Sequence, residues 1–149
     1  MKLYQHFLSL TVLLFASMFL VAQKVETSIN WVTDIPDADN NILYDPGHQL
    51  SIEDFAGSPD NTPNAVAITA SGFVFTTSFH SKGDKATLSI GIYCSFDKKG
   101  SWMKEKGKTA YILEHEQHHF DISYLNTLFF IKKLKQTKFK QENYMEQLR

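Results

Sequence analysis

The stretch Ala86-Thr-Leu-Ser-Ile-Gly-Ile-Tyr-Cys-Ser-Phe96 alternates apolar residues with smaller or more polar ones. Successive side chains of a β-strand point to opposite faces, so this period of two predicts a strand with one buried face. The preceding segment Ala65–Phe79 is rich in β-branched and aromatic residues, and His80–Asp84 has the composition of a turn. These segments therefore predict an antiparallel hairpin.

Farther upstream, residues 24–34 are again rich in β-branched and aromatic types and predict a first strand. Gly72 interrupts the first hairpin segment, and a glycine within a strand predicts a bulge or bend. Cys94 falls on the apolar face of the second hairpin segment, where we expect inert packing rather than a nucleophile. As Cys94 is the single cysteine of the chain, an intramolecular disulfide is excluded.

Downstream of the hairpin the apolar period becomes helical, which predicts a helix from an N-cap at Thr109 to about Lys138. One apolar stripe recurs at steps of three and four residues: Leu113, Phe120, Tyr124, Leu128 and Ile131. Further apolar residues lie off this stripe, so we expect the helix to be buried on several sides. The predicted fold is α+β, with a small antiparallel β-sheet packed against a long C-terminal helix.

The N-terminus has the layout of a secretory signal peptide. A basic start is followed by the uncharged, mostly apolar run Phe7–Val21 and the small residue Ala22. The run is shorter than the about 20 residues of a membrane-spanning helix, so cleavage is favoured over an uncleaved anchor. We therefore expect a signal peptide at residues 1–22 and one exported domain at 23–149, periplasmic or extracellular, without stable membrane insertion after cleavage. The net charge of −1 gives no general attraction to nucleic acid.

The predicted helix contains the pattern H-E-x-x-H at His115, Glu116 and His119. Residues four apart lie one turn apart on one helix face, so two imidazoles can bind one Zn²⁺ ion. Glu116 lies about 100° around the helix from His115, where its carboxylate can reach a zinc-activated water without ligating the metal. The pattern therefore predicts a zinc-dependent hydrolase with Glu116 as general base.

The run Leu113-Glu-His-Glu-Gln-His-His-Phe-Asp-Ile122 resembles the signature of the predicted secreted zinc-dependent proteases called domain of unknown function 922. The segments Ile52–Gly57, Ala67–Gly72 and Phe96–Trp102 fit the same family, and the resemblance covers about Asn30 to Leu134. The resemblance implies a zincin-like metallopeptidase fold that acts on a peptide or protein substrate. It also implies that His115 and His119 are the zinc ligands and Glu116 is the catalytic base.

A catalytic zinc ion usually has three protein ligands and one open position, and the third ligand is not evident from spacing. The candidates are Glu142 and Glu146 from a following helix, His80 and His48 from loops, and Asp121. Asp121 and His118 fit better as neighbours of the ligands, because helical geometry turns them away from the pair. The family's proteins continue beyond the end of this chain, so a truncated C-terminus could leave the chain without a ligand and inactive.

Two other functions compete with peptide hydrolysis. One is a non-catalytic metal-binding or structural envelope protein that retains the histidine cluster, and the other is a partner-binding envelope protein whose histidines bind no metal. Histidine and carboxylate ligands also suit divalent ions other than zinc. Trp102 either anchors the helix entry on the sheet, which we favour, or lines the substrate cleft.

Overall fold

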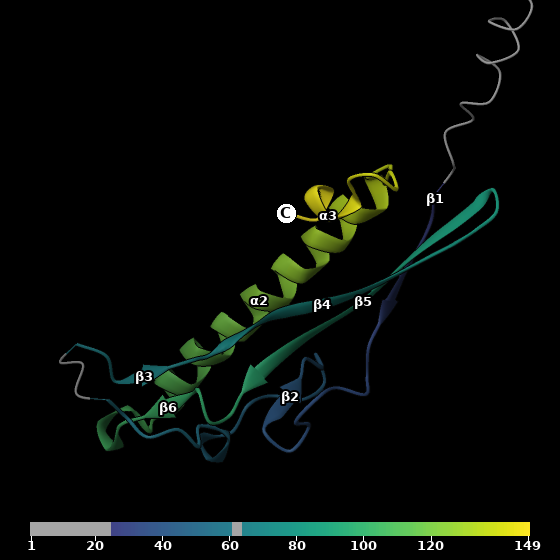
Figure 1. The fold of residues 1–149 in the computed structure, drawn as a ribbon. Coiled ribbons are helices and arrows are strands. Elements are labelled where there is room, and N and C mark those ends of the chain that lie inside the picture. Colours follow the sequence, from purple (N-terminus) through teal and green to yellow (C-terminus); the bar gives the residue numbers. More distant parts are fainter. Residues whose placement is uncertain (1–24, 61–63) are drawn as a thin grey trace, which may run out of the picture.

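The computed structural model describes residues 25–60 and 64–149, so the predicted signal peptide at residues 1–22 lies outside the described part of the chain. The predicted alternation is confirmed in β5 (Lys85–Asp97), the central strand of a four-stranded sheet. Every second side chain from Ala86 to Phe96 is at most 2% exposed. Figure 1 shows β4 and β5 as a long twisted hairpin beside the helix α2.

The sheet is mixed, which corrects the predicted antiparallel arrangement. β4 (Ser71–Lys82) pairs antiparallel with one side of β5. On the other side, β1 (Val25–Trp31) runs parallel to β5, and β2 (Asn41–Leu43) pairs antiparallel with its end. Strand composition does not encode direction. A parallel pair needs a connection of a dozen or more residues, and the long chain between β1 and β5 provides it.

The hairpin closes in a tighter turn than the predicted His80–Asp84. β4 and β5 stay paired up to Lys82 and Lys85, so Gly83 and Asp84 form the turn. Gly83 has a φ of +63°, a left-handed conformation that glycine adopts without steric cost. A glycine at the first position of a two-residue loop is typical of a tight hairpin turn.

The predicted long helix is confirmed as α2 (Ala110–Gln136). The side chain of Thr109 accepts a hydrogen bond from the backbone N–H of Ile112, as expected of an N-cap. One face of α2 packs against β4 and β5 along its length, as Figure 1 shows. The most buried residues of this face are Glu116, Phe120, Thr127 and Leu134.

The outer face of α2 corrects the expectation that the helix is buried on several sides. Four apolar residues on this face are 51–77% exposed: Tyr111, Ile122, Leu125 and Phe129. Leu128, which the predicted stripe placed in the core, is 40% exposed. Because apolar residues occupy both faces of α2, its period does not reveal which face the sheet covers. No helix among residues 25–60 and 64–149 is long and apolar enough to cross a membrane.

Two hydrophobic clusters hold α2 against the rest of the protein. The cluster near the N-terminal half of α2 contains Leu50, Phe55, Ala67, Cys94, Phe96, Met103 and Phe120. The cluster near its C-terminal end contains Leu88, Ile90, Ile92, Leu134, Phe139 and Leu148. The short helix α3 (Tyr144–Gln147) belongs to the second cluster, where Tyr144 stacks on Phe79 at a centroid distance of 4.8 Å. The C-terminal segment therefore packs at the far end of α2 from Glu116.

A second, two-stranded sheet lies beside the N-terminal half of α2. It pairs β3 (Ala67–Ile68) antiparallel with β6 (Trp102–Met103). Trp102 is 7% exposed in this sheet, in agreement with a packing role. The predicted bulge at Gly72 is wrong, because Gly72 pairs regularly with Ser95. The strand is interrupted instead at Thr69 and Ala70, where the chain passes from β3 to β4.

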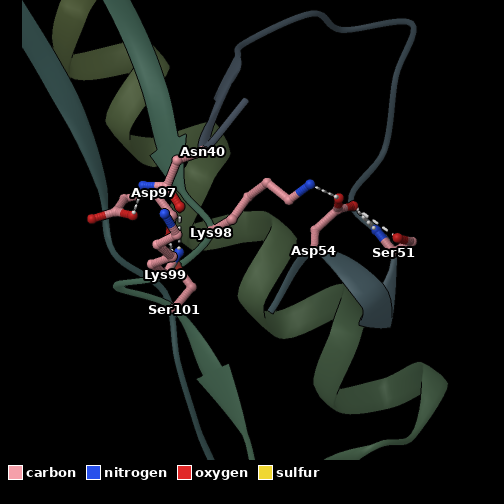
Figure 2. Close-up of polar contacts among 7 residues, drawn as sticks. All are labelled: Asn40, Ser51, Asp54, Asp97, Lys98, Lys99 and Ser101. Carbon is pink, nitrogen blue, oxygen red and sulfur yellow. Dashed lines mark hydrogen bonds and ion pairs between the residues drawn. The ribbon is translucent and has the colours of Figure 1, made fainter. Parts of the chain in front are cut away.

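Ser101 is fully buried and fixes the end of β3. Its hydroxyl donates to the carbonyl oxygen of Asp97 at 2.6 Å and accepts from the backbone N–H of Ala70 at 2.9 Å. The carboxylate of Asp97 accepts a hydrogen bond from the Asn40 side chain at 2.8 Å. Figure 2 shows Asn40, Asp97 and Ser101 grouped at this corner. Because Ala70 follows Thr69 directly, this network holds Thr69 in place beside α2.

Two short 3₁₀ helices complete the fold around this corner. η2 (Ile52–Asp54) begins at Ser51, whose backbone N–H and hydroxyl both donate to Asp54 Oδ2 at 2.8 Å. Asp54 also forms an ion pair with Lys98 at 3.9 Å, drawn in Figure 2. η3 (Glu105–Gly107) leads from β6 into α2. The ion pair joins η2 to the loop that precedes β6.

Candidate metal centre

The structure brings His115 and His119 together as the helical spacing predicts. Their Nε2 atoms lie 3.1 Å apart, and the two rings are perpendicular, with an interplanar angle of 87°. Tetrahedral coordination with zinc–nitrogen bonds of 2.0–2.1 Å needs two nitrogens about 3.3 Å apart. Both side chains are exposed. The separation of the two nitrogens is therefore close to that of two imidazole ligands on one divalent ion.

Glu116 completes a compact group of three possible ligands. One ligand atom from each of His115, Glu116 and His119 lies within 4.8 Å of the others. Unlike the histidines, Glu116 is only 5% exposed. Its Oε2 atom accepts a hydrogen bond of 2.7 Å from the hydroxyl of Thr69. The group thus combines two exposed imidazoles with a buried carboxylate that has one fixed partner.

This group opens into a groove between α2 and the segment that joins β3 to β4. The groove has a volume of about 480 Å³ and is lined by Ala67, Ile68, Thr69, Ser71, His115, Glu116, His119, Ile122 and Ser123. At one side the hydroxyls of Ser71 and Ser123 form a hydrogen bond of 2.8 Å. The groove therefore offers both apolar side chains and hydroxyl groups to a ligand bound beside the histidines.

Asp121, a candidate third ligand, lies on another side of α2. Its Oδ1 atom accepts hydrogen bonds from the Tyr44 hydroxyl at 3.1 Å and from the Gln117 side chain at 2.9 Å. Burial raises the pKa of Tyr44, and the hydrogen bond to Asp121 raises it further. Tyr44 also stacks on Tyr124 at 4.0 Å. Asp121 therefore helps to pack the β2 side of the protein against the helix and does not join the histidine pair.

The other candidate ligands do not belong to the group of His115, Glu116 and His119 either. His48 follows the turn after β2, and its backbone N–H donates to the Asp45 carbonyl. His80 lies near the hairpin turn and contacts the Ser78 hydroxyl at 2.9 Å. His118, the expected neighbour, faces a different hollow from the metal group.

Glu142 lies just before α3 and Glu146 lies within it, at the C-terminal end of α2. Leu134 marks this end of α2. At a rise of 1.5 Å per residue, it lies roughly 20 Å along the helix axis from His119. Within residues 25–60 and 64–149, the group of His115, Glu116 and His119 is the one cluster of at least three possible metal-ligating side chains. A third protein ligand other than Glu116 is therefore not found in the described chain.

Thr69, the partner of Glu116, is not predicted from the sequence. Thr69 lies 47 positions before Glu116 in the chain, in a segment that composition marks only as strand. No local pattern connects a strand residue to a helix residue at that separation. The interruption between β3 and β4 that includes Thr69 is visible only in the structure.

No family model matches the chain, and no match was found among the curated proteins or among the solved structures. The resemblance to the predicted secreted zinc-dependent proteases therefore stays a prediction, and the function is argued from the geometry of the site.

Proposed function

We propose that this protein is an exported zinc-dependent peptidase, with His115 and His119 as metal ligands and Glu116 as general base. The observation that carries the proposal is the 3.1 Å separation of the two Nε2 atoms beside a buried carboxylate, at the wall of an open groove. Export is proposed from the sequence of residues 1–22 alone.

The chemistry follows from the different surroundings of the three side chains. A bound Zn²⁺ ion would lower the pKa of a water that it holds toward about 7 and polarise the carbonyl group of a substrate. Glu116, held by Thr69, accepts a proton from the attacking water through its second oxygen and delivers it to the leaving amine. His115 and His119 are exposed toward the groove, so substrate can reach the reacting centre.

The edge of β3 supplies a place for the substrate backbone. The carbonyl of Val66 accepts a hydrogen bond from Lys104 N–H of the β6 side at 2.9 Å. Backbone groups alternate between the two edges of a strand, so those of Ala67 face the edge away from β6. Ala67, Ile68 and Thr69 all line the groove. An extended peptide can pair with such an edge by backbone hydrogen bonds, which favours a peptide over a compact small molecule.

Replacement of Glu116 by Gln tests the proposal, with Glu114→Gln as the matched control. Glu114 is an exposed residue two positions earlier on the same helix and does not line the groove. We expect Glu116→Gln to abolish hydrolysis of an internally quenched peptide library while zinc still binds in a one-to-one ratio. Glu114→Gln retains hydrolysis. Survival of activity in Glu116→Gln, or no hydrolysis by the zinc-loaded wild type, would rule the proposal out.

A further inference from the structure

We propose that Thr69 is a positioning residue that holds Glu116 as a base and keeps its carboxylate from becoming a metal ligand. The inference rests on the proposed function. It concerns a residue outside the H-E-x-x-H pattern, on a different element of the fold from the helix that carries the metal group.

The contact between the two side chains is short and directional. The Thr69 hydroxyl lies 2.7 Å from Glu116 Oε2 and 3.4 Å from the backbone oxygen of the same residue. In the shorter contact the Thr69 hydroxyl is the donor and Glu116 Oε2 is the acceptor. Among the described residues, no other side chain or backbone group hydrogen-bonds to this carboxylate.

Thr69 is itself fixed on both sides. Before it, Ala67 is 9% exposed and belongs to the core cluster that includes Phe120. After it, the backbone N–H of Ala70 donates to the buried hydroxyl of Ser101. The Thr69 side chain is therefore presented to the helix by a rigid segment, as a catalytic carboxylate needs if its position is to be reproducible.

The hydroxyl of Thr69 determines whether the Glu116 carboxylate acts as a base or as a metal ligand. With Oε2 held by Thr69, one carboxylate oxygen remains for proton transfer. Glu116 is only 5% exposed, so little solvent is in contact with its carboxylate to replace a lost partner. Its carboxylate lies within 4.8 Å of the histidine nitrogens, and an ion held there is the nearest alternative partner for a negative charge. Without the hydroxyl, Glu116 rotates toward the ion and ligates it, and the base is lost.

The experiment compares Thr69→Val, which removes the hydroxyl, with Thr69→Ser, which keeps it. Thr127→Val is the matched control: Thr127 is fully buried on the same helix face, and its hydroxyl donates to the Ser123 carbonyl at 2.8 Å. Each purified full-length mature protein is loaded with Co²⁺ for visible absorption spectra, which respond to a change of ligand. Each is also loaded with Zn²⁺ for kinetics on one peptide that the wild type cleaves.

We expect Thr69→Val to lower kcat on the order of 100-fold with KM within about twofold, because the reacting groups lose their alignment while substrate binding is kept. Its Co²⁺ spectrum differs from that of the wild type, and its affinity for zinc rises. Thr69→Ser restores both the wild-type spectrum and most of kcat. Thr127→Val matches the wild type in both measurements.

A Thr69→Val protein with wild-type kcat and an unchanged Co²⁺ spectrum overturns the inference and leaves the peptidase proposal intact. An equal loss of kcat in Thr127→Val also overturns it, since the effect is then general loosening of the helix. Failure of the wild type to bind Co²⁺ or Zn²⁺ overturns both proposals. If Thr69→Val does not fold, a crystal structure of the zinc-loaded wild type decides: Glu116 bonded to zinc, or separated from Thr69, refutes the positioning role.

Discussion

Zinc is expected to stabilise the folded protein, and His115→Ala is expected to remove that stabilisation. The Nε2 atoms of His115 and His119 already lie at 3.1 Å, close to the about 3.3 Å that tetrahedral coordination requires. Little conformational entropy is therefore lost when the ion binds the native state. In the unfolded chain the helix that aligns the two rings is lost, so the ion binds the native state preferentially.

The size of the effect follows from mass action. A ligand that binds only the folded state at 100 times its dissociation constant stabilises it by about 2.7 kcal/mol. For a domain of on the order of 120 residues, each kcal/mol shifts the melting temperature by roughly 3–5 °C. Saturating zinc is thus expected to raise the melting temperature by on the order of 10 °C, and excess EDTA to reverse the shift.

Thermal unfolding followed by circular dichroism, with stepwise zinc additions, measures this shift for the wild type and three variants. His115→Ala and His119→Ala are expected to lose the shift. His118→Ala is the matched control, because His118 is an exposed histidine of the same helix that does not belong to the metal group. Equal zinc stabilisation in His115→Ala, or equal loss in His118→Ala, would refute the assignment of the ligands.

Two further predictions concern the core. Phe120→Ala is expected to lower the free energy of unfolding by about 3–5 kcal/mol, because Phe120 is 2% exposed and packs edge-on against Tyr44. Phe129 is 67% exposed, so Phe129→Ala is expected to change this free energy by less than about 0.5 kcal/mol. Urea denaturation measures both values. Burial raises the pKa of Cys94, partly offset by its hydrogen bond with Thr127. The folded state therefore holds the thiol proton more tightly than the unfolded state, and this contribution to stability is lost as pH rises above about 9. Urea denaturation at a series of pH values is expected to show that Cys94→Ala loses less stability above this pH than the wild type does. Identical dependence of stability on pH in the two proteins would contradict the prediction.

The parts of the fold that the sequence predicts are those with strong local periodicity. Ala86–Phe96 alternates without a break and is confirmed as the central strand. Thr109 caps a helix that ends within two residues of the predicted Lys138. The H-E-x-x-H spacing places two imidazoles on one helix face whatever the helix packs against, so this part of the site depends on local geometry alone.

The parts that the sequence does not predict depend on which segments meet in space. The long connection between β1 and β5 permits their parallel pairing, and the residues of β1 do not encode this direction. The face of α2 that the sheet covers is ambiguous, because apolar residues such as Phe120 and Phe129 occur on both sides. Thr69 contacts Glu116 across 47 positions. Such contacts arise only from the tertiary fold, and a single sequence carries no periodic signal for them.

The donor set of the site bears on the choice between a hydrolase and a structural metal site. Structural zinc sites are closed by four protein ligands, whereas catalytic sites keep a position open. The described residues bring two imidazoles and one carboxylate together, and the Thr69 hydroxyl holds one oxygen of that carboxylate. An ion at His115 and His119 would keep positions open toward a groove of about 480 Å³. Open positions of this kind agree with the proposed hydrolase better than with a closed structural site.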